Sequence, residues 1–483
     1  MSTSLFLEDV NQWYEQYEVA SPKEQYQQLV ELLSTPLDPD YVNNKSELGD
    51  VLIEMQSLLE GSGLWQEALS LTKLVQEHQP AFYQKEFCYL GNFLLQYGLF
   101  HKDDELIDNS LGYYKQDPVT GIDMLLSVFN DLRLYDEHER AVDLSREAYK
   151  PVATSSKLMG GSEMEFGLTV LADLFGNAYK KLKHGQSIDW DAFKTEAESF
   201  GLVPESLPLI SGELSGQRAT GEALVAQFKD DRNAVLQSLF PRFQMRMYDQ
   251  RQLSFVCGQT IWLIVLEFLQ EPERLKSKKK LSLPENFFNF NSKQLDRHIA
   301  QLLGSFISDR NAEGFTVLWG LPHVYEFLLA EGLIDESVYD GAIAAVSVVK
   351  QRLLSKWPRP LWYYSFVHHW GKPDYQTEED FEAEAKRFAD SIKEFTPLSE
   401  EPSEPFSLEK SLGGLTGAIA KNWASSPAFS EPLPNVTASS NPQASIPSKS
   451  SKPKSSKPRK SGLSEIKSLT KKSKNKKKKK KGF

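Results

Sequence analysis

Residues 83–100 read YQKEFCYLGNFLLQYGLF, and their apolar side chains recur at the spacing of one helix face. The steps between them alternate between four and three residues, at Tyr83, Phe87, Leu90, Leu94 and Tyr97. An α-helix brings side chains three and four residues apart onto the same face. The segment therefore predicts a helix that is buried along this face, and residues 64–75 have a similar pattern.

The chain around this helix repeats itself at a fixed interval. A triplet that ends in leucine and an aromatic residue recurs every 35 residues, as Gly63-Leu64-Trp65, Gly98-Leu99-Phe100 and Arg133-Leu134-Tyr135. A period close to this length is typical of helix–turn–helix arrays. We therefore expect paired helices that meet at each triplet. Helix ends are expected at three prolines, Pro80, Pro118 and Pro151.

Residues 46–151 resemble the tetratricopeptide-repeat (TPR) family. The spacing of that family's first-helix signature, W-x2-L-G-x2-Y, is matched by Phe87, Leu90, Gly91 and Leu94. In the preceding unit, the family's turn, second-helix and closing-proline positions hold Gly63, Trp65, Ala68 and Pro80. The resemblance implies a TPR-like α-solenoid body with a groove for peptides. No groove residue is carried over from the family.

Composition divides the 483 residues into five parts. The interpretation is a TPR-like helical region over 1–200, a Gly- and Pro-rich loop or boundary over 201–222, and a second all-helical region over 223–395. A Pro- and Ser-rich linker follows over 396–448, and a Lys-rich tail over 449–483. Both C-terminal parts are expected to be disordered, because they lack the apolar residues of a core. The expected fold class is all-α.

The most apolar stretch of the chain runs over residues 255–269. A membrane span needs about 20 apolar residues, so this stretch is interpreted as a buried helix and no transmembrane segment is expected. Cys88 and Cys257 are the only cysteines, which excludes a disulfide framework and a paired-Cys zinc site. The N-terminus lacks the basic start of a secretory signal. We expect a cytoplasmic protein, or a nuclear one if the organism is eukaryotic.

Charge is divided unevenly along the chain, although the net charge is only −11. Residues 449–481 hold 16 Lys and Arg and the single acid Glu465, which leaves +15 there and −26 elsewhere. Lysine runs bind polyanions by releasing condensed counterions. RNA, a ribosome or DNA is favoured over an anionic membrane surface, because no second membrane signal is present. The predicted polyanion-binding residues are Lys471, Lys472, Lys474, Lys476, Lys477, Lys478, Lys479, Lys480 and Lys481.

Two further segments are candidate contacts. A second basic cluster is interpreted as an exposed loop, with a phosphate contact as the alternative, and consists of Arg274, Lys276, Lys278, Lys279 and Lys280. Residues 406–424 of the linker form a candidate docking helix, for the body itself or for a partner. Its stripe at helical spacing is Leu408, Leu412, Leu415, Ile419 and Trp423. Chance spacing is the alternative, because three glycines weaken the helix.

Residues 357–375 are dense in aromatic side chains, which form either the core that caps the helical array or a partner hot spot. The chain contains no nucleotide-binding, hydrolase or metalloprotease motif, so we expect no cofactor and no metal. An enzyme remains an alternative. Its site would need polar side chains to converge in the second helical region, around His323, Glu326, His368 and His369.

These patterns favour a non-enzymatic adaptor or scaffold. Its acidic body would hold a protein partner of unknown identity in a concave groove, and its tail would bind a nucleic acid or a ribosome. A flexible linker between two weak contacts raises the overall affinity through effective concentration. The alternative is a pure protein-interaction module with a self-inhibitory tail, since charges of opposite sign lie on one chain.

Overall fold

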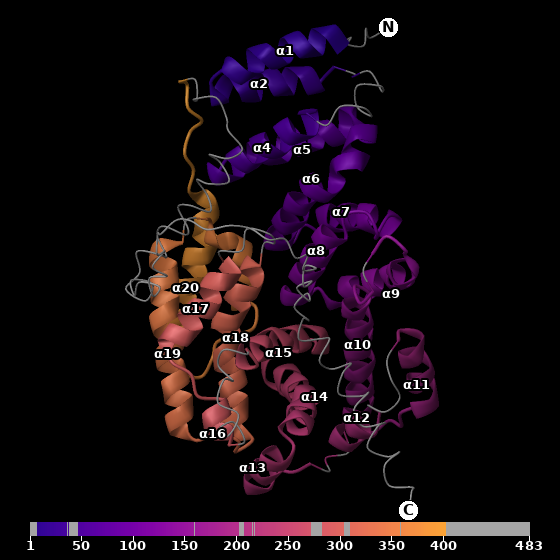
Figure 1. Cartoon of the computed structure of the whole chain (residues 1–483), viewed down its shortest axis with the longest axis vertical. Coiled ribbons are helices and arrows are strands. Elements are labelled where there is room, and N and C mark those ends of the chain that lie inside the picture. The colour runs from indigo at the N-terminus through magenta and orange to yellow at the C-terminus, as the bar shows by residue number, and fades with distance from the viewer. Residues whose placement is uncertain are drawn as a thin grey trace, which may run out of the picture. The chain divides into compact units, whose positions relative to one another are not determined.

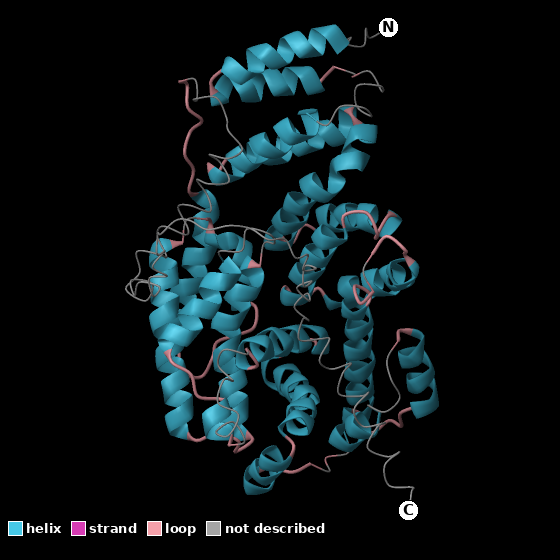
Figure 2. Cartoon of the chain, in the orientation of Figure 1, coloured by secondary structure: helices cyan, strands magenta, loops and turns pink. Residues whose placement is uncertain are grey.

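The computed structural model describes residues 7–35, 37, 47–158, 160–201, 207–214, 216, 218–271, 283–303, 310–357 and 359–401. Across these residues the chain consists of helices and their connections, without a β-strand (Figure 2). The all-α class expected from the sequence is therefore confirmed for the body.

Helical hairpins stack along the N-terminal half of the body (Figure 1). They are α1 (Leu7–Val19) with α2 (Pro22–Leu33), α4 (Glu47–Gly61) with α5 (Trp65–His78), α6 (Pro80–His101) with α7 (Asp104–Gln116), and α8 (Ile122–Leu134) with α9 (His138–Thr154). The first helices α4, α6 and α8 contact one another in series, and the second helices α7 and α9 also touch. This stacking of pairs is the organisation of a helical-repeat body.

Left-handed residues follow the first helix in three of these four hairpins, at the ends of α4, α6 and α8. Their φ angles are 71°, 58° and 63°, at Gly63, Lys102 and Asp136. At the first turn, Leu64 N–H donates to Leu59 O at 2.9 Å and Gly63 N–H donates to Glu60 O at 3.1 Å, which is a Schellman closure. The first triplet thus forms its turn. The two later triplets instead end their helices and precede the turn, because α6 and α8 extend into them.

The prolines mark helix boundaries in two of the three places. Pro80 is the first residue of α6, and Pro118 separates α7 from α8. The expectation at Pro151 is wrong, because α9 continues to Thr154. Pro151 removes one backbone hydrogen bond in the last turn of α9, and the helix ends three residues later, after the buried Val152.

The stretch 201–222 is not one long loop. After α10 (Met164–Lys183) and α11 (Trp190–Ser199), it contains α12 (Leu207–Leu214), which packs on α10 and α14, and the start of α13 (Gly221–Asp230). The loop expectation is therefore wrong for α12. A buried ion pair between Glu213 and Arg242 holds this short helix despite the nearby glycines and prolines. The helical regions on either side belong to one compact unit.

The second helical region is centred on two buried helices, α15 and α18. Its elements are α14 (Arg232–Arg251), α15 (Phe255–Leu269), α16 (Pro284–Phe287), α17 (Ser292–Leu303), α18 (Asn311–Ala330), α19 (Glu336–Lys356), the 3-10 helix η2 (Leu361–His368), α20 (Glu378–Asp390) and the 3-10 helix η3 (Ser391–Lys393). α15 coincides with the apolar stretch, and it contacts α8, α10, α14 and α18. The prediction of a buried helix there is confirmed.

Candidate functional site

Three of the segments singled out in the sequence lie outside the residues that the structure describes. They are the nine tail lysines within 471–481, the basic cluster within 274–280, and the linker stripe within 406–424. Their roles remain predictions. The candidate site is therefore sought among the described side chains of the body.

The aromatic segment 357–375 belongs to the core. The rings of Trp362, Phe366 and Trp370 are fully buried. Trp362 packs against two rings of the N-terminal hairpins, with centroids 5.2 Å from those of both Trp65 and Phe100. Tyr364 of the same segment stacks on Phe315 of α18, with ring centroids 4.0 Å apart. Of the two alternatives, the core interpretation holds, but the segment joins two regions and does not cap the end of the array.

Helices α6, α8 and α10, called the inner helices below, face other parts of the same chain. η2 contacts α6, and α15 contacts both α8 and α10. Trp370 Nε1 donates to Leu134 O at 2.9 Å, and the hydroxyls of Tyr135 and Ser365 lie 2.9 Å apart. Burial of large aromatic side chains stabilises this contact. The groove that the sequence led us to expect is therefore filled along α6, α8 and α10 by the second helical region.

A cluster of ionisable side chains in the C-terminal half of α18 has a buried centre, His323 and Glu326, and an exposed edge at Asp374. The carboxylate of Glu326 accepts the N–H of Asp374 through Oε1, and its Oε2 lies 3.3 Å from Arg251 Nη2. His323 Nδ1 is 4.0 Å from the same Oε2. Arg251 also donates to Asp374 Oδ1 at 3.0 Å. The cluster thus joins α14 and α18 to the loop that follows η2.

Burial shifts the pKa values of Glu326 and His323 in opposite directions. Burial raises the pKa of Glu326 to about 7. The hydrogen bond from the Asp374 N–H and the charge of Arg251 oppose the rise, while the negative charge of Asp374 adds to it. Burial also lowers the pKa of His323 to about 3, because the neutral ring is favoured and the cations Arg251 and Lys350 lie nearby. At neutral pH the imidazole is therefore uncharged, while Glu326 is close to its titration midpoint.

A second buried cluster surrounds Glu384 of α20. Its Oε1 accepts from Trp319 Nε1 at 2.8 Å and Lys350 Nζ at 3.1 Å, and it lies 3.2 Å from His368 Nε2. Burial alone would raise the pKa of Glu384, but the bond to His368 and the charge of Lys350 outweigh it and hold the pKa at about 2. Lys350 Nζ also lies 4.4 Å from the Trp319 ring centroid, a cation–π contact. This ion pair ties α18, α19, η2 and α20 together.

The four residues of the enzyme alternative do not meet in one place. His323 and Glu326 share the first cluster, and His368 belongs to the second. The ring of His369 packs on Tyr135, with centroids 5.3 Å apart. Each histidine therefore has a different set of contacts.

Sequence reasoning missed the partners that complete both clusters, Arg251, Lys350 and Glu384. Lys350 carried a local signal. It lies four residues after Val346, on the apolar face of α19 that also includes Ala342. The helical spacing therefore predicts that the Lys350 side chain is buried. Arg251 and Glu384 carried no such signal, because their contacts depend on helices far away in the sequence.

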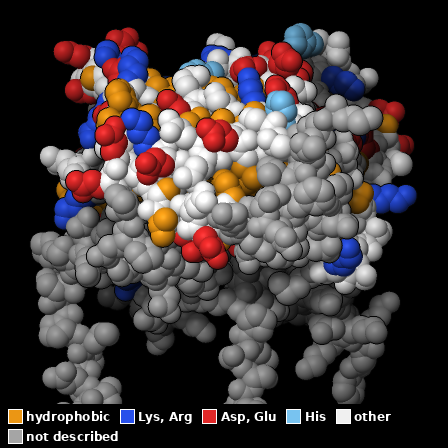
Figure 3. Space-filling view, turned by 90° about the horizontal axis from the view of Figure 1, so that it is seen from above, with side chains coloured by type: hydrophobic (Ala, Val, Ile, Leu, Met, Phe, Trp, Pro, Cys, Tyr) orange, Lys and Arg blue, Asp and Glu red, His pale blue; other side chains and the backbone are white. Residues whose placement is uncertain are grey.

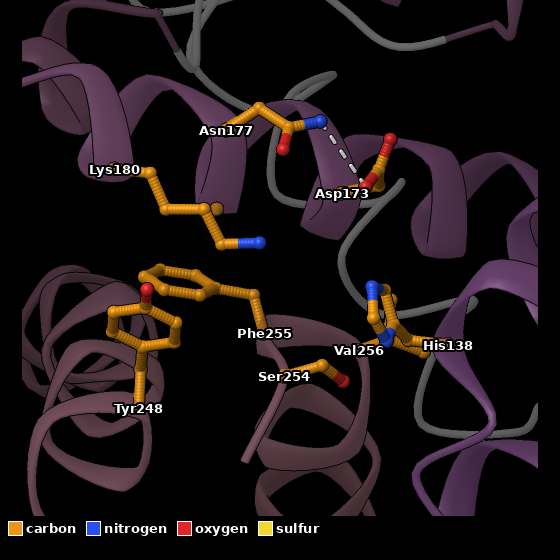
Figure 4. A pocket seen from close by; sticks show the side chains of 9 residues that line it. His138, Asp173, Asn177, Lys180, Tyr248, Ser254, Phe255 and Val256 are labelled. Atoms are coloured by element: carbon orange, nitrogen blue, oxygen red, sulfur yellow. Dashed lines mark hydrogen bonds between the residues drawn. The ribbon is translucent and has the colours of Figure 1, made fainter. Parts of the chain in front are cut away.

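A small hollow lies between α9, α10, α14 and α15 (Figure 4). Its polar lining includes His138, Asp173, Asn177 and Lys180, with Asn177 Nδ2 donating to Asp173 Oδ1 at 3.2 Å. The space accommodates about one water molecule. It is too small for an organic substrate, which needs a pocket of several hundred Å³.

Metal and membrane sites were sought within the same described part of the chain. No three side chains among its His, Cys, Asp and Glu residues are grouped so as to hold a metal ion. Its helices include none with the length and apolar character required to cross a bilayer.

The end of the body seen in Figure 3 displays acidic and basic side chains side by side, with apolar side chains in small areas between them. This end is therefore not a uniformly acidic surface. The outer helices α7 and α9 carry six exposed acids, at Asp104, Glu105, Asp108, Glu139, Asp143 and Glu147, and α20 carries a further group of exposed acids in its first turns. Lys115 pairs with Asp143 and Glu147. Arg140 neutralises part of the group on α7 and α9 through Asp104 and Asp108.

Comparisons with known proteins found no matching family model, no matching curated protein and no matching solved structure.

Proposed function

We propose that this protein is a non-enzymatic helical-repeat adaptor. Its acidic body binds a protein partner, and its Lys-rich tail binds a polyanion, which is RNA, a ribosome or DNA. The observation that carries the proposal is the division of charge, with +15 on residues 449–481 and −26 on the rest of the chain. A tail of this density neutralises several phosphates at once.

The partner surface of the body is assigned to the outer helices. The inner helices α6, α8 and α10 pack against the second helical region, so their faces are engaged within the chain. The outer helices α7 and α9 carry six exposed carboxylates against the partly buried cations Lys115 and Arg140, which leaves a net negative face that favours a partner with a basic surface. Binding by the outer face would leave the core undisturbed.

The linker joins the two contacts. Eight prolines lie between Pro397 and Pro447, a composition typical of linkers that give a tail reach. Each contact then raises the effective concentration of the other, so two weak interactions act as one stronger interaction.

The tail is tested by comparing the full chain with a chain that ends at residue 448. We expect the full chain to bind single-stranded RNA and duplex DNA, with an affinity that falls steeply between about 50 and 200 mM salt. The truncated chain should bind at least about 100-fold more weakly at the lower salt concentration. Fluorescence anisotropy with labelled oligonucleotides measures both.

A matched control keeps the tail at full length and replaces Lys476–Lys481 with glutamine. If charge carries the binding, this variant loses most of the affinity although the chain length is unchanged. Equal binding by the full chain and the truncated chain would contradict the tail assignment.

The self-inhibited module is the second candidate, favoured by the opposite charges on one chain. It predicts that truncation at residue 448 strengthens binding of the body to its protein partner. Cross-linking of full-length protein between tail lysines and the carboxylates of α7 and α9 distinguishes it. The absence of such cross-links at low salt would count against this candidate.

A further inference from the structure

Residues 394–401 cross back from the C-terminal end of the body to its N-terminal helices. Over the turn between α4 and α5, Thr396 N–H donates to Ser62 O at 2.6 Å. At the start of α2, Lys23 N–H donates to Ser399 O at 3.3 Å. Figure 1 shows the segment as an extended orange trace that runs from α20 to α2. Contacts far apart in the sequence are therefore made by one short stretch of backbone.

The turn at Gly63 is shaped to admit this crossing. A Cβ atom placed on Gly63 would lie 1.9 Å from Glu394 O and 2.9 Å from Phe395 Cα. Its φ of 71° also favours glycine. Glycine is therefore favoured at position 63 for two independent reasons: the left-handed backbone conformation, and the close approach of Glu394 and Phe395.

The attachments of this segment are few and mostly exposed. Lys23 Nζ lies 2.8 Å from Glu400 Oε1, with side chains that are 53% and 78% exposed. Phe395 is 67% exposed, and Leu398 packs partly buried against the core. Exposed ion pairs contribute little and weaken with salt. The backbone of the segment therefore lies close to the body, but its attachments contribute little free energy.

The opposite end of α2 has a firmer anchor. The buried amide of Gln79 donates to Leu33 O at 2.9 Å and to Thr35 O at 2.8 Å. The start of α2 is held by the segment at Lys23, whereas its C-terminal half contacts α5, buries Leu29, Leu32 and Leu33, and is held by Gln79. A helix fastened weakly at one end and firmly at the other has a defined direction in which to open.

We propose that residues 394–401 form a releasable strap. In the closed state, the strap fastens the α1–α2 hairpin at Lys23 and starts the linker beside α2. In the open state, the hairpin turns about its anchor at Gln79, and the linker starts at Lys393. The strap thereby sets both the freedom of the first hairpin and the point from which the tail reaches out.

The first experiment measures amide hydrogen exchange in the full chain with the variant Gly63→Ala. We expect exchange at Thr396 and in the first turns of α2 to accelerate at least about tenfold, which corresponds to about 1.4 kcal/mol. Amides near Leu33 should keep their protection, because Gln79 still holds that end.

The matched control is Gly185→Ala. Gly185 has a φ of 70° and closes α10 with the same pair of hydrogen bonds, but its added Cβ meets no described atom within 4 Å. Gly185→Ala introduces the same backbone strain as Gly63→Ala, but its Cβ does not clash with another described segment. The strap amides should therefore exchange as in the wild type.

A second test does not depend on the glycine. Lys23→Glu should accelerate exchange of the strap about threefold at low salt, and adding Glu400→Lys should restore it. The difference should vanish near 1 M salt, where charges are screened within about 3 Å.

Two outcomes would overturn the strap. One is an equal effect of Gly63→Ala and Gly185→Ala on the exchange of Thr396. The other is a wild-type strap that exchanges as fast as an unstructured peptide.

Discussion

At the scale of single residues, Glu326 is a buried acid whose pKa lies close to neutral pH. Its pKa is raised from 4.5 to about 7 by burial. A group whose pKa is higher in the folded state stabilises the fold fully below its unfolded pKa, and that contribution is lost as pH rises. For Glu326 the loss therefore falls between about pH 4.5 and 7, and amounts to about 3 kcal/mol.

This argument predicts the effect of Glu326→Gln. The amide keeps an oxygen for the N–H of Asp374 and has no charge to bury. The variant should gain stability relative to the wild type as pH rises from 4.5 to 7, by up to about 3 kcal/mol, and the difference should then stay constant. Urea unfolding at a series of pH values measures this difference.

The control for this prediction is Glu139→Gln on the exposed side of α9. Its stability relative to the wild type should stay within about 0.5 kcal/mol at every pH. Contributions from His323 and Glu384 are common to both proteins, so the difference isolates Glu326. A flat profile for Glu326→Gln would contradict the assigned protonation.

At the scale of elements, Arg242 of α14 joins three parts of the chain. It binds Glu213 of α12 through two bonds of 2.7 and 2.9 Å, and it donates to Ala219 O at 2.7 Å and to Glu331 at 3.0 Å. Bidentate pairs between Arg and a carboxylate are strong and directional. This clamp explains why α12 forms where composition alone predicted a loop.

Removing one partner of the clamp should destabilise the protein more than removing an exposed pair. Glu213→Ala leaves the buried guanidinium without its main partner, which costs about 3–5 kcal/mol. Lys386→Ala breaks an exposed pair with Asp390 and should cost about 1 kcal/mol or less. Chemical denaturation measures both, and similar losses would argue against the clamp.

At the scale of the whole body, Trp362 joins the N-terminal hairpins to the second helical region. It is fully buried, its backbone N–H donates to Ser391 Oγ at 2.8 Å, and its ring packs against Trp65 and Phe100. Contacts of this kind make two helical regions unfold as one unit. Helical repeats without them unfold in parts.

We expect the wild type to unfold in a single thermal transition, and Trp362→Ala to cost about 3–5 kcal/mol and to separate that transition into two. Calorimetry of the full chain detects the separation. Tyr89→Ala on α6 is the control, since Tyr89 is an aromatic residue that is 52% exposed and its loss should change stability little. A single transition in Trp362→Ala would show that other contacts suffice to couple the regions.

The candidate clusters were only partly predictable from the sequence. His323 and Glu326 lie one turn apart on α18, so their proximity follows from helix geometry. Glu384 meets Lys350 across 34 residues, and Arg251 meets Glu326 across 75. Such pairings depend on how helices pack, which periodicity does not encode.

Local spacing in the sequence was enough to place the helices, because a helix face is set by residues three and four positions apart. It identified α6 from its stripe and α15 from its apolar run. Only the tertiary structure shows that η2 packs against the inner helix α6 and that residues 394–401 pass over Gly63. The physical reason is distance along the chain: burial of aromatic area and close backbone approach between segments some 300 residues apart leave no periodic trace in either segment.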